Sequence, residues 1–223
     1  MVALGGWTEG SEKYSKMAKD PKLREGFVKS VVEFLKKWDF DGLDMDWDYP
    51  GTRGGDKLVD KQDFTLLLKE LKEALDPHGY LLSAAVSPGK ATIDVAYNIK
   101  EIDPLLDFYS IMAYDYHGGS WEEHIGHNAP LYPKPDDDKF NYTQYLNINF
   151  TMHYWLDKGA SKNKIVMGLP LYGRTFSLQN GSHDRVPQWR EKAKYINDVR
   201  KWGGPNGTIV DEGGILPYVE VRI

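Results

Sequence analysis

Residues 41–50 read Asp41-Gly42-Leu43-Asp44-Met45-Asp46-Trp47-Asp48-Tyr49-Pro50, and this stretch decides the fold of the chain. Its aspartates at 44, 46 and 48 alternate with leucine, methionine and tryptophan at 43, 45 and 47. Successive side chains of a β-strand point to opposite faces, so the alternation predicts a strand over Phe40–Trp47. One face of that strand is apolar, and the other carries a row of carboxyl groups about 6.6 Å apart.

Strand-like and helix-like segments alternate on both sides of this stretch. Apolar residues recur at helical spacing in two segments. They are Pro21–Trp38, with Phe27, Val31, Phe34 and Leu35 in phase, and Gln62–Leu75, with Phe64, Leu67, Leu68, Leu71 and Leu75 in phase. We also expect strands at Val2–Leu4, Tyr80–Val86, Asp107–Ala113 and Lys164–Leu171, and a helix at Tyr142–Lys158. Repeated strand–helix units predict an α/β fold with a parallel sheet covered by helices.

The alternation fits both a (β/α)8 TIM barrel and a doubly wound open sheet. No G-x-G-x-x-G fingerprint follows a strand, which weakens the nucleotide-binding version of the open sheet. About five strands precede Phe176, too few to close an eight-stranded barrel of roughly 250 residues. We therefore expect residues 1–176 to form an incomplete barrel that serves as a catalytic domain, and the chain to be a fragment that lacks its start and its end.

The sequence changes character after Phe176. Ser177–Gly207 is polar and rich in glycine, asparagine and charge. Within it, Lys192–Trp202 is predicted to form a short helix. Thr208–Ile223 resembles a pair of strands. We expect residues 177–223 to be the beginning of an inserted α+β subdomain.

Composition excludes some partners. The chain has 223 residues and a net charge of -5, with no cluster of basic residues among aromatics, which argues against nucleic acid. No apolar run is long enough to span a bilayer. Aromatic residues make up 13% of the chain, which suits a cleft that stacks against sugar rings and equally suits a large α/β core.

The sequons point to secretion. Asn-x-Ser/Thr occurs four times, more often than the fewer than one expected by chance, at Asn141, Asn149, Asn180 and Asn206. The chain has no cysteine, and Met1–Gly6 shows neither the basic region nor the cleavage site of a signal peptide. We expect a secreted glycoprotein whose signal peptide is not present in this sequence.

The carboxylate row has a plausible chemistry. Burial and like charge both raise carboxyl pKa values, so at least one member should hold a proton near neutral pH, as a general acid must. The alternatives are a solvated acidic loop and a calcium loop, but Tyr49 stands where a calcium loop needs glycine and Gly55 where it needs glutamate. We expect no metal and no cofactor. The spacing of His117, His124 and His127 fits no helix face, so we expect these to pack in loops or hydrogen-bond there.

The chain resembles family 18 glycoside hydrolases, the chitinase family. Residues 41–50 match its D-G-x-D-x-D-W-E-x-P signature at every fixed position except 48, where aspartate replaces glutamate. Four further segments match in order: Ala3-Leu4-Gly5-Gly6-Trp7, Met112-Ala113-Tyr114-Asp115-Tyr116-His117-Gly118, Gly126-His127-Asn128-Ala129-Pro130-Leu131 (in arthropod chitinases) and Met167-Gly168-Leu169-Pro170-Leu171-Tyr172-Gly173-Arg174. Gly213–Tyr218 resembles part of the inserted domain. The resemblance implies that about strands three to seven of the barrel are present, with the motifs at the carboxyl ends of strands.

The resemblance also implies an activity and roles. Such enzymes cut β-1,4-linked N-acetylglucosamine with retention, using the substrate's own acetamide as nucleophile. Residue 48 is then the general acid and base, Asp46 orients the acetamide, Asp44 modulates Asp46, and Tyr114 donates to the acetamide oxygen. The implied substrate-binding residues are Gly5, Gly6, Trp7, Thr8, Tyr49, Met112, Ala113, Asp115, Tyr172 and Arg174. Chitin or chito-oligosaccharides are the implied ligands, and we expect a monomer.

Asp48 divides the functional alternatives. Its side chain lacks one methylene and falls about 1.5 Å short, while displacements near 1 Å can cost about 100-fold in rate. The sequence therefore predicts either a chitinase with weakened hydrolysis or a chitinase-like lectin that binds chitin without cutting it. A third alternative is a non-functional domain within a larger chitinase.

Overall fold

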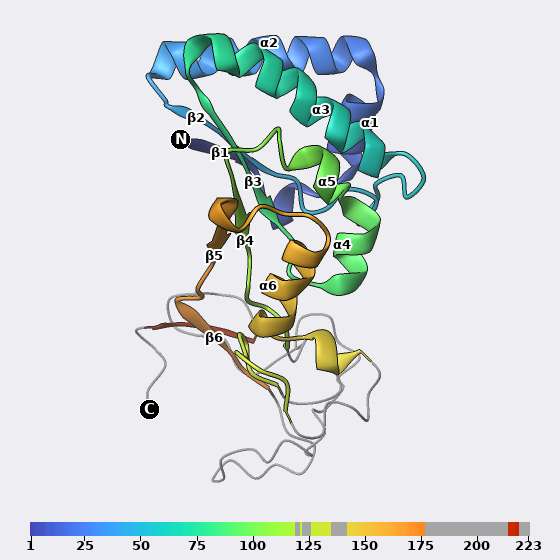
Figure 1. The fold of residues 1–223 in the computed structure, drawn as a ribbon, viewed down its shortest axis with the longest axis vertical. Coiled ribbons are helices and arrows are strands. Elements are labelled where there is room, and N and C mark those ends of the chain that lie inside the picture. The colour runs from blue at the N-terminus through green and yellow to red at the C-terminus, as the bar shows by residue number, and fades with distance from the viewer. Residues whose placement is uncertain (119–120, 122–125, 135–141, 177–213, 219–223) are drawn as a thin grey trace. The chain divides into compact units, whose positions relative to one another are not determined.

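The computed structural model describes residues 1–118, 121, 126–134, 142–176 and 214–218, and the chain divides into two compact units (Figure 1). The first unit comprises Met1–Met112 and Thr151–Gly168, and the second comprises Ala113–Phe150 and Leu169–Ile223. No helix among the described residues is long and apolar enough to cross a membrane. The predicted domain boundary at residue 176 borders a stretch outside the described residues and stays a prediction.

The first unit contains one parallel sheet. Its strands are β1 (Val2–Gly5), β2 (Gly42–Asp46), β3 (Leu81–Val86), β4 (Phe108–Ile111) and β5 (Ile165–Met167). They lie in the order β1-β2-β3-β4-β5, and every neighbouring pair is parallel. This order confirms the predicted strand–helix alternation, although the strands at 40–47 and 164–171 are shorter than predicted.

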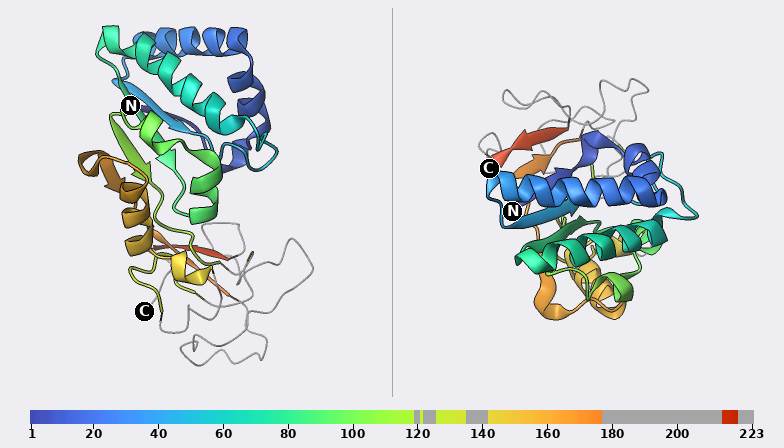
Figure 2. Two further views of the ribbon diagram at one scale, coloured as in Figure 1. Left: turned by 45° about the vertical axis from the view of Figure 1, so that its right-hand side comes forward. Right: turned by 90° about the horizontal axis from the view of Figure 1, so that it is seen from above.

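Helices connect these strands. They are α1 (Glu12–Lys19), α2 (Pro21–Trp38), α3 (Asp60–Leu75), α4 (Lys90–Ala96), α5 (Ile99–Ile102) and α6 (Ile148–Asp157). Short 3-10 turns lie at Trp7–Glu9, Asp76–His78, Thr143–Tyr145 and Lys162–Lys164. The two long helices α2 and α3 contact each other, and the right-hand view of Figure 2 shows them side by side. The sequence reasoning predicted these two helices but did not identify α1, α4 or α5.

Helix α2 has clear local causes. The Asp20 carboxylate caps its start by accepting hydrogen bonds from the backbone N–H groups of Lys22 (2.8 Å) and Leu23 (3.3 Å), and Pro21 occupies the first turn. Its C-cap, Asp39, adopts the left-handed conformation at φ 55°, which ends the helix before β2.

The core of the first unit lies between the sheet and these helices. Leu43, Met45 and Trp47 are 2%, 0% and 1% exposed, as the alternation predicted. The Trp47 ring lies 5.9 Å from Tyr14 of α1 and 5.7 Å from Phe64 of α3, the latter edge-on. All five apolar positions predicted for α3 are buried.

Two helix predictions were wrong in detail. Phe34 of α2 is 46% exposed, and Val28 is buried instead, because the buried stripe of this helix is centred on Val28, Val31 and Leu35. The predicted helix at Tyr142–Lys158 is α6, which begins only at Ile148; a separate 3-10 turn precedes it, and the Asn147 side chain accepts from the Phe150 N–H (2.9 Å).

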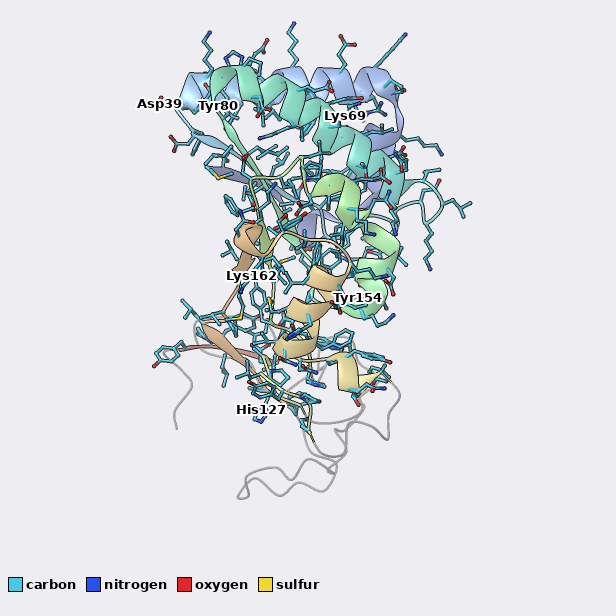
Figure 3. All side chains as sticks on the ribbon, in the orientation of Figure 1. Asp39, Lys69, Tyr80, His127, Tyr154 and Lys162 are labelled. Carbon is cyan, nitrogen blue, oxygen red and sulfur yellow. The ribbon has the colours of Figure 1, made fainter. Side chains whose placement is uncertain are left out.

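Polar contacts attach α6 to α4 within the first unit. Tyr154, labelled in Figure 3, donates its hydroxyl proton to Asp94 of α4. Lys158 and Lys90 also pair with Asp94, at 3.0 Å and 2.8 Å. These donors hold the pKa of the Asp94 carboxyl well below its usual range, although partial burial opposes them.

The second unit has less regular structure among its described residues. Strands β6 (Tyr172–Arg174) and β7 (Ile215–Pro217) form an antiparallel pair. β7 lies within the predicted strand pair of Thr208–Ile223, but its partner β6 lies outside that segment. The predicted helix at Lys192–Trp202 falls outside the described residues.

We predict that core and surface leucines respond differently to truncation. Leu71→Ala should lower the free energy of unfolding by about 2–5 kcal/mol, because Leu71 is 0% exposed and its removal leaves a cavity. Leu58→Ala makes the same chemical change at a side chain that is 92% exposed and should stay within about 0.5 kcal/mol of wild type. Urea denaturation of both variants checks this, and equal losses would contradict the assigned core.

Candidate active site

The carboxylate row lies where strand β2 ends. Asp44 and Asp46 belong to β2 and alternate with the buried Leu43 and Met45, and Asp48 lies two residues beyond the end of the strand. The strand is thus shorter than the predicted 40–47. The conformation of the loop after β2, and not the alternation of the strand, therefore determines where the Asp48 side chain lies. Its peptide bond to Tyr49 is cis.

Strand β1 approaches the same strand end closely. The Gly6 N–H donates to the Asp46 carbonyl oxygen at 2.8 Å. Gly5 has φ 121°, and a Cβ there would lie 2.0 Å from that same oxygen. A side chain at position 5 is therefore excluded, which gives a physical reason for the glycine pair before Trp7.

Asp44 is held from the neighbouring strand. Asp44 pairs in register with Ser83 of β3, and the Ser83 hydroxyl donates to the Asp44 carboxylate. This contact fixes the orientation of Asp44 beside Asp46. Ser83 was not among the predicted residues, although the strand alternation could have identified it.

Burial and mutual repulsion raise the pKa of Asp46 to about 7, with burial the larger cause and the charges of Asp48 and Asp44 next. Burial also raises the pKa of Asp48, while hydrogen bonding from Tyr49 and the nearby Arg53 charge oppose that change. The row thus holds a proton near neutral pH, in line with the prediction.

Two carboxylate oxygens of the row lack partners. Oδ1 of Asp46 and Oδ1 of Asp48 are buried and accept no hydrogen bond from the described residues. An unsatisfied buried acceptor costs about 1–3 kcal/mol. Buried acceptors without a donor in the protein are often hydrogen-bonded by a bound molecule, so these two oxygens are candidate contacts for a ligand.

Tyrosines surround the row. The pKa of the Tyr97 hydroxyl is raised chiefly by its burial and also by the Asp48 and Asp46 charges, and this hydroxyl accepts from the Ser87 N–H at 3.2 Å. Burial likewise raises the pKa of Tyr49. Neutral hydroxyls therefore line the row, and Tyr97 was missed because it follows α4, a helix that the sequence reasoning did not identify.

An exposed indole lies beside the row. Trp7 is 63% exposed, and Thr8 next to it is also exposed. The Arg53 guanidinium carbon lies 3.5 Å from the centroid of the Trp7 indole ring. Arg53 comes from an irregular loop after Pro50, and no periodic pattern in the sequence could have identified this contact.

A second cluster lies in the second unit. Arg174 of β6 pairs with the Asp115 carboxylate at 2.7 Å, and Asp115 has a left-handed backbone at φ 58°. The Tyr114 and Tyr172 rings meet edge-on at 6.1 Å. The structure thus brings these four predicted residues together.

Asn128 supports this cluster and was missed as a site residue. Its side-chain oxygen accepts from the Asp115 N–H at 2.9 Å, and its side-chain amide donates to the Tyr172 carbonyl at 3.0 Å. The signal was present, because Asn128 lies in the matched segment Gly126–Leu131.

The other predicted residues are distributed as follows. Met112 follows β4 and its N–H donates to the Val86 carbonyl at 3.0 Å, while Ala113 is fully buried. His117 is buried and His127, labelled in Figure 3, is exposed. Within the described ranges no three His, Asp or Glu side chains cluster as metal ligands would. His124, Asn141, Asn180, Asn206 and Gly213 lie outside the described residues.

These features define a class of protein. A row of carboxyl groups, with raised pKa values at Asp46 and Asp48, lies at the carboxyl end of a parallel β/α strand beside tyrosines and an exposed indole, as expected of a (β/α)8-barrel glycoside hydrolase. Residues 1–222 match the model for glycosyl hydrolases family 18. The chain belongs to this family, whose fold is the (β/α)8 barrel.

Similar proteins include chitinases and a protein described as a pseudo-chitinase. The chain is 43% identical over 221 residues to probable chitinase 2 of Drosophila melanogaster, covering 99% of this chain and 41% of the relative. Catalytic domain 2 of the Group II chitinase of Ostrinia furnacalis is 39% identical with a TM-score of 0.83, over 98% of this chain and 54% of that one. Human YKL-39, described as a pseudo-chitinase with retained chitooligosaccharide binding, is 32% identical with a TM-score of 0.83, over 98% and 57%. The chain thus spans about half the length of these relatives or less.

We predict that Asp46 makes stability depend on pH. Its folded pKa of about 7 exceeds the ordinary 3.8, so the neutral carboxyl stabilises the fold at low pH, and this contribution is lost as pH rises towards and through 7. Asp46→Asn should therefore gain stability relative to wild type between about pH 4 and 8, by roughly 1–2 kcal/mol once screening by solvent is allowed for.

Urea denaturation of both proteins across this pH range measures the effect. Near pH 4 both side chains are neutral and the two proteins should differ little. A difference between them that is constant with pH would contradict the raised pKa.

Proposed function

We propose that this chain forms the chitin-binding and catalytic part of a family 18 chitinase in which Asp48 weakens hydrolysis. The observation that carries the proposal is the carboxylate row itself. Asp46 has a pKa near neutrality, and the Asp46 and Asp48 oxygens that lack donors are available to a ligand. The sequence similarity to probable chitinase 2 and the shared family support chitin or chito-oligosaccharides as the ligand class.

Roles for the row follow from substrate-assisted retaining hydrolysis. Asp48 delivers a proton to the leaving glycosidic oxygen and later accepts one from water. Asp46 orients the N-acetyl group of the substrate so that its oxygen attacks the anomeric carbon, and its carboxylate stabilises the positive charge that develops. Asp44, held by Ser83, is one of the neighbours that raise the pKa of Asp46 and so helps to retain the proton there.

Roles for the residues outside the row rest on the matched motifs. Tyr114 donates a hydrogen bond to the acetamide oxygen as it attacks, and Met112, Ala113, Asp115, Tyr172 and Arg174 bind sugars. Gly5, Gly6, Trp7, Thr8 and Tyr49 form a further part of the sugar-binding surface. The Asp115–Arg174 pair gives that cluster charged groups that can hydrogen-bond to sugar hydroxyls.

The position of Asp48 favours weakened catalysis. Asp48 is only 6% exposed, so its side chain, one methylene shorter than glutamate, has little freedom to extend towards a leaving group. General acid catalysis supplies about 10²–10⁴ in rate, and misplacement by about 1 Å can remove about 100-fold. The second candidate function is a lectin that binds chitin without cutting it, and the resemblance to YKL-39 favours it.

We predict that Asp48→Glu restores hydrolysis. In the full-length protein it should raise kcat for an N-acetylglucosamine hexamer about 100-fold with a small change in KM, because the added methylene moves the acid towards the leaving oxygen. Release of reducing ends from the hexamer measures this, and Asp48→Asn is the matched variant that cannot supply a proton.

Three outcomes separate the alternatives. Equal rates for wild type and Asp48→Glu would contradict an impaired acid. Binding of the hexamer by both without cleavage by either would establish the lectin. Absence of both binding and cleavage would remove chitin as the ligand.

We further propose that the protein is secreted and glycosylated at Asn149. Asn149 is exposed at the start of α6, but the Thr151 of its sequon is fully buried and donates its hydroxyl proton to the Pro88 carbonyl oxygen at 2.8 Å. The enzyme that attaches the glycan recognises both residues, so the glycan must be added before α6 packs.

We predict that Thr151 serves both glycosylation and folding. In a secretory host, Asn149 should carry a glycan in wild type and in Thr151→Ser, and none in Thr151→Val or Asn149→Gln. Thr151→Val should lose about 1 kcal/mol of stability because Pro88 then lacks its donor, and Thr151→Ser should lose about as much because it removes a buried methyl group. Glycopeptide mapping and denaturation check both statements; an unmodified Asn149 in secreted wild type would contradict the first.

A further inference from the structure

The loop Gly51–Asp56 connects the carboxylate row to helix α3, and Arg53 stands within it with a left-handed backbone at φ 50°. The Arg53 side chain makes two hydrogen bonds to main-chain oxygens. Its Nη1 donates to the Trp7 carbonyl at 2.7 Å and to the Asp48 carbonyl at 3.1 Å. The Arg53 side chain thus links the main chain of Trp7 to the main chain of Asp48.

The same guanidinium covers one face of the Trp7 indole. Its carbon lies 3.5 Å from the ring centroid, the distance of a stacked contact. Trp7 is still 63% exposed, so much of the ring stays open to solvent. An indole with one face occupied and its carbonyl bonded has less rotational freedom than a solvated one, which lowers the entropy lost when a sugar stacks on it.

The loop that carries Arg53 is itself fixed. Buried Asp60, at the start of α3, accepts hydrogen bonds from the Ser15 hydroxyl (2.6 Å), the Gly51 N–H (2.9 Å) and the Asp56 N–H (2.8 Å). A Cβ at Gly55 would lie 2.3 Å from the Asp60 carboxylate. Both ends of the loop are therefore anchored on one buried side chain.

The Asp48 carbonyl is also held by Ser11, the residue that precedes α1. The Ser11 hydroxyl, fully buried, lies 3.3 Å from that oxygen and donates to the Tyr49 carbonyl at 3.0 Å. Arg53 therefore bonds to a main-chain segment whose position Ser11 already constrains. Through Arg53, the Trp7 main chain is held at a fixed position relative to that segment.

We infer that Arg53 is a positioning residue, which acts through Trp7 and the Asp48 main chain to hold a sugar-stacking surface in a fixed place beside the carboxylate row. This inference rests on the proposed binding of chito-oligosaccharides. It makes affinity for long oligomers depend on a side chain that need not touch the sugar.

A double-mutant cycle tests it in the full-length protein. Arg53→Met keeps the aliphatic stem and removes the donors and charge, and it should weaken hexamer binding about three- to tenfold by calorimetry. In a Trp7→Ala background the same change should have less than about a twofold effect, because the residue through which Arg53 acts is absent. Arg53→Lys, which keeps the charge but not the planar donor fork, should restore only part of the loss.

Lys57→Met is the matched control. Lys57 is exposed and directly follows the loop Gly51–Asp56. Its replacement removes one positive charge but none of the Arg53 contacts, so hexamer affinity should stay at the wild-type value. Wild-type affinity in Arg53→Met would overturn the inference. An equal loss in both backgrounds would overturn it too, since Arg53 would then contact the sugar itself.

A readout without ligand separates this inference from the proposed function. With 5-fluorotryptophan incorporated, the Trp7 fluorine resonance, assigned by Trp7→Phe, should shift in Arg53→Met and not in Lys57→Met. If wild type binds no oligomer but the resonance shifts, the proposed function fails and the hold on Trp7 stands. An unshifted resonance overturns the inference whether or not oligomers bind.

Discussion

The burial of Leu43, Met45 and Trp47 is the constraint on which the site depends. Each is at most 2% exposed, and Trp47 packs between Tyr14 of α1 and Phe64 of α3. Because a strand alternates its faces, packing these residues against the helices forces Asp44 and Asp46 to the opposite side. A slip of one residue would bury two carboxylates in the apolar core, at a cost of several kcal/mol for each ion. The hydrophobic core thereby determines where the acidic chemistry lies.

The surroundings of the carboxylate row determine its protonation. Ser83 satisfies one oxygen of Asp44, but the buried Oδ1 atoms of Asp46 and Asp48 receive no donor from the described residues. Incomplete solvation and like charge keep a proton on the row near neutral pH. Main-chain contacts keep the row in place: Gly6 bonds to the Asp46 carbonyl, and Ser11 and Arg53 lie against the Asp48 carbonyl. The electrostatic cost is tolerated because the backbone around it is fixed.

Elements with a periodic sequence pattern were predicted correctly, whereas short helices and loop contacts were not. Periodic patterns identified α2, α3 and the parallel strands, and the two-residue period placed the carboxylates. The short helices α1, α4 and α5 were missed because they have few turns over which a period can show, and with them Ser11 and Tyr97. Phe34 was assigned to the core because its spacing also fits an inward face, whereas packing selected Val28. Arg53 and Asp60 act through loop contacts between residues distant in sequence, which no local pattern encodes.

The close approach of β1 to β2 has an evolutionary consequence. Gly5 admits no side chain beside the Asp46 carbonyl, and the surrounding backbone is bonded without using the Asp48 carboxyl group. The main-chain contacts around residue 48 therefore do not depend on whether that residue is aspartate or glutamate. The codons of these two amino acids differ only at the third base, so under the role proposed for residue 48 one point mutation changes turnover and leaves these main-chain contacts in place. On the proposed roles, a chitin-binding protein and a hydrolase built on this cleft are separated by one methylene group at residue 48.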